Sequence, residues 1–155
     1  MLLPDVNVLV YAFRTESPDH ADVHAWLTAL VNGPATFALS ELALSGFVRV
    51  VTNPRIFRTP TPPAMALEFT EILLGAPNSR PIRPGPRHYE IFAGLCRGLD
   101  ARGNDVADAY HAALAIESGS ELVTCDRGFA RFPGLRWQHP LPAKTKTKKS
   151  GARSR

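Results

Sequence analysis

The chain has 155 residues, of which 45% are hydrophobic and 21% are charged, and its formal net charge is +4. This length fits one domain, and this composition excludes a wholly disordered chain, a collagen and a coiled coil. Because no apolar run reaches the roughly 20 residues of a membrane span and the start Met-Leu-Leu-Pro-Asp does not resemble a secretory signal, we expect a cytoplasmic protein with no membrane partner.

The first half of the chain alternates short apolar segments with helical patterns. Residues 2–10 are apolar except for Asp5 and Asn7, which is typical of a strand buried on both faces that passes into a helix near Asn7. An amphipathic helix is expected to begin at Ser17, as its N-cap, and to end at Asn32. The further elements expected here are a strand over 35–39, a helix from the capping residue Ser40 to Val51, and a helix over about 63–74.

The second half continues this alternation. A helix is predicted over roughly 87–99, and residues 106–118 form the strongest helical pattern, with small alanines that suit close packing. A strand follows over 121–125, and a last strand is predicted over 135–137. The two cysteines lie in different elements and are expected to be reduced thiols. Strands that alternate with helical patterns predict an α/β fold with a mostly parallel sheet.

The positive charge is concentrated at the C-terminal end. Residues 144–155 contain six basic residues and no acid, whereas the chain before them has more acids than bases. We expect a folded domain over 1–141 and a disordered basic tail over 142–155. Such a tail either adds sequence-independent affinity for nucleic acid or is a solvated end that aids solubility.

Four acidic residues are placed where predicted strands end and the following helices begin. They are Asp5, Glu41, Asp108 and Asp126. A helix dipole or a turn would explain Glu41, Asp108 and Asp126 individually, but a buried Asp5 is costly without partners. In parallel α/β sheets, ligands bind at the carboxyl ends of the strands. We therefore expect all four acids at that edge.

Carboxylates gathered at one edge require positive charge. Two carboxylates about 4 Å apart repel by roughly 4 kcal/mol at an effective dielectric constant of 20. Oxygen ligands without a His or Cys set suit a hard ion such as Mg²⁺ or Mn²⁺, and such ions promote phosphodiester hydrolysis. The acids thus indicate nuclease or phosphatase chemistry.

Four segments around these acids carry a resemblance to a known family. The segments are Asp5-Val6-Asn7-Val8-Leu9, Glu41 ahead of Ser45-Gly46-Phe47-Val48-Arg49, Asp108-Ala109 ahead of Ala112-Ala113-Leu114-Ala115, and Thr124-Cys125-Asp126-Arg127-Gly128-Phe129. Together they resemble the PIN domain, and more narrowly the VapC toxins of bacterial toxin–antitoxin pairs. The match covers residues 1 to about 141. It implies a three-layer α/β/α fold and a Mg²⁺-dependent endoribonuclease toxin that inhibits translation.

The resemblance also implies partners and residue roles. The expected partners are an RNA substrate, a VapB-like antitoxin that blocks the site, and a second copy in a homodimer. By position, Asp5 and Asp108 would be the metal ligands, with Mg²⁺ the expected ion and Mn²⁺ the other that suits them. Glu41 would support the metal or the attacking water, and Asp126 would complete the catalytic set. Asn7 and Thr124 would orient these carboxylates.

Two further residues and two further functions are weighed against this interpretation. Asp105 could reach the same site, but an N-cap of the following helix is the simpler interpretation. His111 is left outside the site, because a single helix histidine is more often a packing or surface residue. The other functions are a PIN-fold nuclease of housekeeping RNA processing and an inactive RNA-binding module that uses Arg49, Arg55, Arg58 and the tail.

Overall fold

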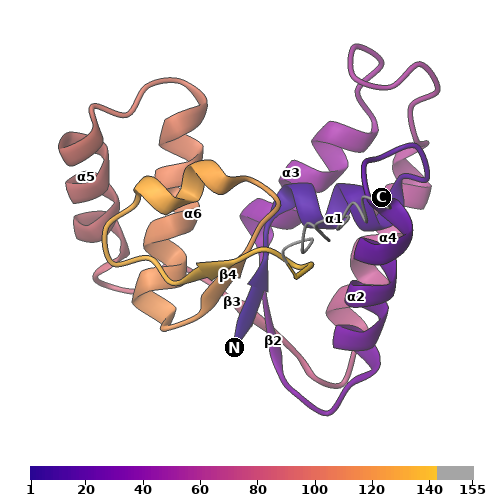
Figure 1. The fold of residues 1–155 in the computed structure, drawn as a ribbon, viewed down its shortest axis with the longest axis horizontal. Coiled ribbons are helices and arrows are strands. Elements are labelled where there is room, and N and C mark those ends of the chain that lie inside the picture. Colours follow the sequence, from indigo (N-terminus) through magenta and orange to yellow (C-terminus); the bar gives the residue numbers. More distant parts are fainter. Residues whose placement is uncertain (143–155) are drawn as a thin grey trace, which may run out of the picture.

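A five-stranded parallel sheet forms the middle layer of the molecule (Figure 1). The structure is a computed structural model, and it describes residues 1–142. The expected basic tail therefore lies, apart from its first residue, outside the described residues. In spatial order the strands are β3 (Ser79–Ile82), β2 (Phe37–Ser40), β1 (Leu2–Pro4), β4 (Glu121–Val123) and β5 (Trp137–Gln138).

Helices cover both faces of this sheet, so the predicted three-layer α/β/α fold is confirmed. Side chains alternate along each strand: Leu3, Ala38 and Leu122 face one layer, while Phe37, Leu39 and Val123 face the other. On the first face lie α5 (His88–Leu99) and α6 (Asn104–Ser118); on the second lie α1 (Val6–Phe13), α2 (His20–Asn32), α3 (Glu41–Val51) and α4 (Pro63–Gly75). No helix within residues 1–142 is long and apolar enough to cross a membrane.

Three predictions about local structure need correction. The edge strand β3 is not predicted, because Arg80 and Pro81 give this segment no strand pattern. The second helix begins at His20 rather than near Ser17, with Asp19 before it in the left-handed region at φ 51°. Asp105 is not an N-cap: α6 is preceded by Gly103 at φ 55°, where glycine avoids the steric cost of a side chain.

The order of the strands brings distant segments to one edge. β1 lies between β2 and β4, so their carboxyl ends stand side by side. Asp5 follows β1 directly and Thr124 follows β4, while Ser40 ends β2 and caps α3 by accepting a hydrogen bond from the Ala43 amide. This capping role of Ser40 is the one that the sequence predicts.

Candidate active site

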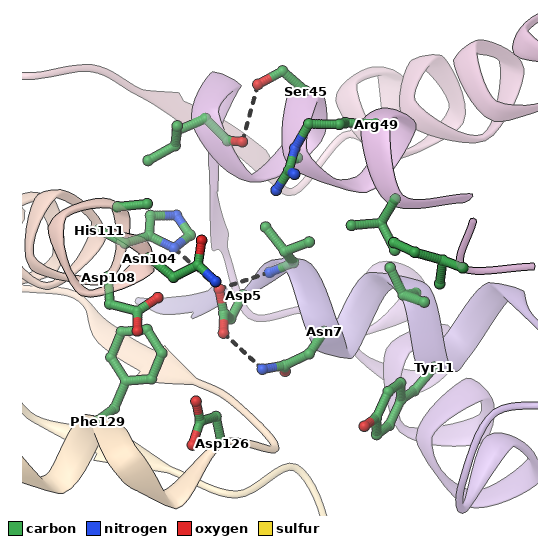
Figure 2. Close-up of a pocket in the computed structure, with 17 residues that line it drawn as sticks. Asp5, Asn7, Tyr11, Ser45, Arg49, Asn104, Asp108, His111, Asp126 and Phe129 are labelled. Carbon is green, nitrogen blue, oxygen red and sulfur yellow. Dashed lines mark hydrogen bonds and ion pairs between the residues drawn. The ribbon is translucent and has the colours of Figure 1, made fainter. Parts of the chain in front are cut away.

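A cleft of about 870 Å³ opens at the carboxyl ends of β1 and β4 (Figure 2). One wall comes from α6 and the segment after β4, and the other comes from α1 and α3. Three of the four predicted acids, Asp5, Asp108 and Asp126, line this cleft together with Asn7 and His111. The structure therefore brings together carboxylates that lie more than 100 residues apart in the sequence.

Asp5 is the most firmly held of these acids. This residue is 6% exposed, and its side chain caps α1 by accepting a hydrogen bond of 2.7 Å from the Val6 amide. The same carboxylate accepts from Asn7 Nδ2 at 2.9 Å, from Thr124 Oγ1 at 2.8 Å and from His111 Nδ1 at 3.1 Å. Both carboxylate oxygens are thereby fixed, which satisfies a group that would be costly to bury alone.

These contacts decide the ionisation of Asp5. Burial acts to raise its pKa, but hydrogen bonds from His111, Thr124 and the Val6 amide, together with attraction to the His111 ring, outweigh it. The pKa of Asp5 therefore lies below its ordinary value of 3.8. Asp5 is a carboxylate at neutral pH, in a fixed orientation.

Asn7 and Thr124 connect the two halves of the site. Asn7 Nδ2 donates to Thr124 Oγ1 at 3.0 Å, and Asn7 Oδ1 accepts from the Cys125 amide at 2.9 Å. Thr124 Oγ1 also accepts from the Asp126 amide at 3.0 Å. This network joins the start of α1 to the segment after β4, and it places both residues where they can orient Asp5.

Asp108 lies in a negative environment. It is half-buried on α6, and one of its oxygens lies 3.1 Å from Arg131. Burial raises its pKa, as do the negative charges of Asp5, Asp126 and Asp105, while Arg131 lowers it; the net shift is upward. Burial and the surrounding negative charge of Asp108 therefore outweigh the positive charge of Arg131.

Asp126 and Glu41 are placed differently. Asp126 caps the 3-10 turn Arg127–Arg131 by accepting from the Gly128 amide at 2.7 Å, and it also lines the cleft. Glu41 does not line the cleft: its carboxylate is 67% exposed and accepts from Arg83 at 2.7 Å. The first turn of α3 directs this side chain toward the segment after β3, a strand absent from the sequence-based expectation.

His111 belongs to the site, although sequence reasoning left it out. It is 3% exposed, and its Nδ1 contacts Asp5 while its Nε2 lies 3.1 Å from Ser40 Oγ. The signal was its position three residues after Asp108, since residues at this spacing share one face of a helix. Asp105 does not contact Asp5; it pairs with Arg131 at 2.9 Å.

The donor atoms of this cleft suit a hard divalent cation. Within residues 1–142 no three His, Cys, Asp or Glu side chains already form a compact metal cluster. The carboxylates of Asp5, Asp108 and Asp126 nevertheless offer only oxygen ligands, which hard ions such as Mg²⁺ and Mn²⁺ prefer. Besides burial, the negative charges of Asp5, Asp126 and Asp105 raise the pKa of Asp108, and the same charges would attract a cation at this position. By charge and by ligand chemistry, the residues fit such an ion.

Comparisons of the sequence with known proteins point to one family. The PIN domain family model matches residues 2–135. Ribonuclease VapC43 of Mycobacterium tuberculosis is 48% identical over 145 residues, which cover 94% of this chain and 99% of that protein. Ribonuclease VapC25 of the same species is 39% identical over 140 residues, covering 90% of this chain and 99% of that protein.

Two solved structures share the fold at low sequence identity. A chain of VapBC2 from Rickettsia felis, bound to a DNA fragment from its promoter, has a TM-score of 0.66 and 20% identity, covering 89% of this chain and 97% of that chain. VapC20 of Mycobacterium tuberculosis, described as a sarcin-ricin loop cleaving toxin, has a TM-score of 0.65 and 16% identity, covering 88% and 99%. At these identities the likeness concerns the fold.

Proposed function

This chain belongs to the PIN domain family, and on that premise we propose that it is an endoribonuclease of the VapC kind, the toxin of a type II toxin–antitoxin pair. It inhibits translation by hydrolysing phosphodiester bonds of RNA. The observation that carries this conclusion is the cleft in which Asp5, Asp108 and Asp126 come together. Relatives named as VapC ribonucleases match nearly the whole chain and support it.

Asp5 and Asp108 are the proposed ligands of the metal, with Mg²⁺ the ion that we propose and Mn²⁺ a substitute. A divalent ion supplies positive charge that stabilises the phosphate oxygens during hydrolysis and makes water a better nucleophile. Asp5 offers a carboxylate whose orientation is fixed by four hydrogen-bonding groups, two at each oxygen. Asp108 offers a carboxylate whose ionisation the same positive charge favours.

The remaining polar residues orient these ligands. Asn7, Thr124 and His111 hold Asp5 through its two oxygens. Asp126 completes the acidic wall of the cleft. Glu41 is the peripheral member of the proposed set, because its pair with Arg83 holds it outside the cleft. Losing Glu41 should therefore cost less activity than losing Asp5 or Asp108.

The proposed partners follow from the same site. Solved VapBC complexes contain this fold together with an antitoxin, and we propose a VapB-like antitoxin for this chain that covers the cleft. An antitoxin arginine among the acids would supply the positive charge that the ion otherwise brings. We also propose that the active form is a homodimer.

The direct test is RNA cleavage with matched carboxamide variants. Purified protein is incubated with total RNA, with Mg²⁺ and with EDTA, and cut positions are mapped. We expect discrete cuts only with Mg²⁺, and a loss of at least about 100-fold for Asp5→Asn and Asp108→Asn. Asp22→Asn is the control, because Asp22 is exposed on α2. Normal cleavage by Asp108→Asn in Mg²⁺ would contradict the proposal.

The toxin assignment has its own experiment. Expression of the chain alone should inhibit growth, and co-expression of the antitoxin should restore it. Growth inhibition that persists unchanged in Asp5→Asn would show that toxicity does not arise from the nuclease site.

A further inference from the structure

Arg49 is the cation that faces the acids across the cleft. It lies in the last turn of α3 and lines the cleft opposite Asp5 and Asp108, as Figure 2 shows. It is exposed, and it has no hydrogen bond or ion pair within residues 1–142. Because the guanidinium of Arg49 faces these carboxylates but is bonded to none of them, it is available for an anionic ligand.

Two other arginines close to the cleft are already engaged. Arg131 bridges Asp105 and Asp108 at 2.9 and 3.1 Å. Arg83 pairs with Glu41 at 2.7 Å. Arg49 therefore differs from both in having no acidic partner. A phosphate can bind to Arg49 without breaking an existing ion pair.

Beyond Arg49, the loop over 52–62 leads away from the cleft. Hydrogen bonds and a ring contact fix its position. Arg14, whose side chain is 12% exposed, donates to Thr61 Oγ1 at 2.6 Å and to the Thr59 carbonyl at 2.9 Å. The same guanidinium lies 4.1 Å from the centre of the Phe57 ring. The Thr61 amide also donates to the Val51 carbonyl at 2.8 Å. These contacts give the loop a defined position relative to α3.

This anchored loop presents two more free cations and an apolar side chain. Arg55 and Arg58 are exposed, and their side chains have no hydrogen bond or ion pair within the described part of the chain. Between them, Ile56 is 53% exposed and lines the cleft. Arginine with an exposed apolar surface is a combination that suits single-stranded RNA, since guanidinium groups bind phosphates and also stack on bases.

We propose that Arg49, Arg55, Arg58 and Ile56, here called the arginine ridge, bind the RNA strand on one side of the cut. Arg49 holds a phosphate close to the bond that is cleaved, and Arg55 and Arg58 hold phosphates further along the strand. Ile56 packs against an unstacked base. This inference rests on the proposed function, and it adds the direction in which the substrate leaves the cleft.

The position of Arg49 favours RNA over a protein as the ligand. A strand cut beside Asp5 and Asp108 must enter the cleft that Arg49 lines, and its anionic phosphates attract this guanidinium, whereas the arginine of the proposed antitoxin does not. The phosphate next to the cut is also repelled by the acidic wall, so a cation opposite that wall compensates for the repulsion. Continuity from Arg49 to Ile56, which lines the same cleft, extends the surface onto the loop.

The test compares the salt dependence of RNA binding in two sets of variants of the full chain. Binding of a short labelled single-stranded RNA is followed by fluorescence anisotropy in EDTA, so that the strand stays uncut. For Arg49→Ala/Arg55→Ala/Arg58→Ala, we expect the slope of log affinity against log salt to become shallower by up to about 2, because each phosphate contact contributes about 0.7. Arg87→Ala/Arg97→Ala is the control, since both arginines are exposed on the opposite helical layer.

A second measurement separates a specific contact from general charge. We expect KM for RNA to rise more than kcat falls in Arg49→Ala, and Arg49→Lys to restore most of the salt slope because it keeps the charge. Circular dichroism of every variant verifies that the fold is retained.

Two outcomes would overturn the arginine ridge. The first is a triple variant whose salt slope equals that of the control. The second is a triple variant that binds RNA normally but no longer binds the co-expressed antitoxin. This second result would make the ridge a protein-binding surface. If the wild-type protein cuts RNA while the triple variant gives either of these results, the proposed function is retained and only the arginine ridge is rejected. Wild-type protein that neither binds nor cuts RNA overturns the proposed function itself.

Discussion

Asp5 and Asp108 share one cleft but have opposite pKa shifts. Asp5 is almost completely buried, yet its pKa is lowered because hydrogen-bond donors surround both of its oxygens. Asp108 is less buried, yet its pKa is raised because burial and three neighbouring carboxylates act in the same direction. Of the two proposed metal ligands, Asp5 is therefore held in its ionised form, whereas the ionised form of Asp108 is destabilised by its surroundings.

This difference predicts a stabilising effect of Asp108→Asn in the metal-free protein. Between pH 3.8 and the raised pKa of Asp108, the native state holds more protons than the unfolded state, so the free energy of unfolding falls as pH rises. The amide removes this penalty. We expect a higher unfolding midpoint in EDTA at pH 7, and a difference that disappears below about pH 3.8. Thermal unfolding at several pH values measures both effects; a lower midpoint at pH 7 would contradict the argument.

His111 gives a second prediction at this scale. His111→Phe keeps a ring in the buried position but leaves Asp5 Oδ1 and Ser40 Oγ without one partner each. We expect a loss of about 1–3 kcal/mol in the free energy of unfolding. The affinity for Mn²⁺ should fall about 10- to 100-fold, as for other residues that orient a metal ligand. Urea unfolding and Mn²⁺ titration measure these two effects; unchanged Mn²⁺ affinity would limit His111 to packing.

At the scale of elements, the cleft depends on the close approach of α3 to α1. A Cβ atom added to Gly46 would lie 2.7 Å from Cγ2 of Val6. The amide of Val6 donates a hydrogen bond to Asp5, which caps α1. The sequence around Gly46 carries the family resemblance, and the structure shows what this glycine does: it lets the start of α1 sit against α3.

Gly46→Ala should therefore destabilise the protein, although alanine favours helix. Overpacking costs about 1–3 kcal/mol, which exceeds the gain of up to about 1 kcal/mol in helix propensity. Gly94→Ala on α5 is the matched control, because nothing lies within 4 Å of its added Cβ, and it should be neutral or stabilising. Urea midpoints of the two variants compare them. Equal midpoints would show that Val6 moves aside without cost.

The elements also show what the sequence could and could not predict. The buried strand before Asp5 and the cap at Ser40 carry local signals, and both were expected. β3 carries none, because a short edge strand with Pro81 is held by its pairing with β2 and not by its own pattern. Since Arg83 follows that strand directly, the pairing that holds Glu41 outside the cleft could not be predicted either. His111 was missed because its role depends on a contact with Asp5, 106 residues away.

At the scale of the whole molecule, we expect the six basic residues of 144–155 to be a separate source of affinity for RNA. Truncation after Ala143 should leave the cut positions and the rate at saturating RNA unchanged. The salt slope of binding should become shallower by at most about 4, at about 0.7 for each of up to six phosphate contacts. Primer extension on the cleaved RNA and anisotropy titrations measure the two effects. New cut positions would show that the tail reads sequence.

The strand order also has a consequence for the newly synthesised chain. Because β1 pairs with β4, β1 leaves the ribosome well before the strand that it needs to close the middle of the sheet. Until Thr124 and Cys125 have been translated, Asp5 lacks one of its donors and Asn7 lacks its hydrogen bonds to this segment. The active site of an enzyme that cleaves RNA is thus incomplete until the segment after β4 has been synthesised, and its messenger meets the assembled site only after that point.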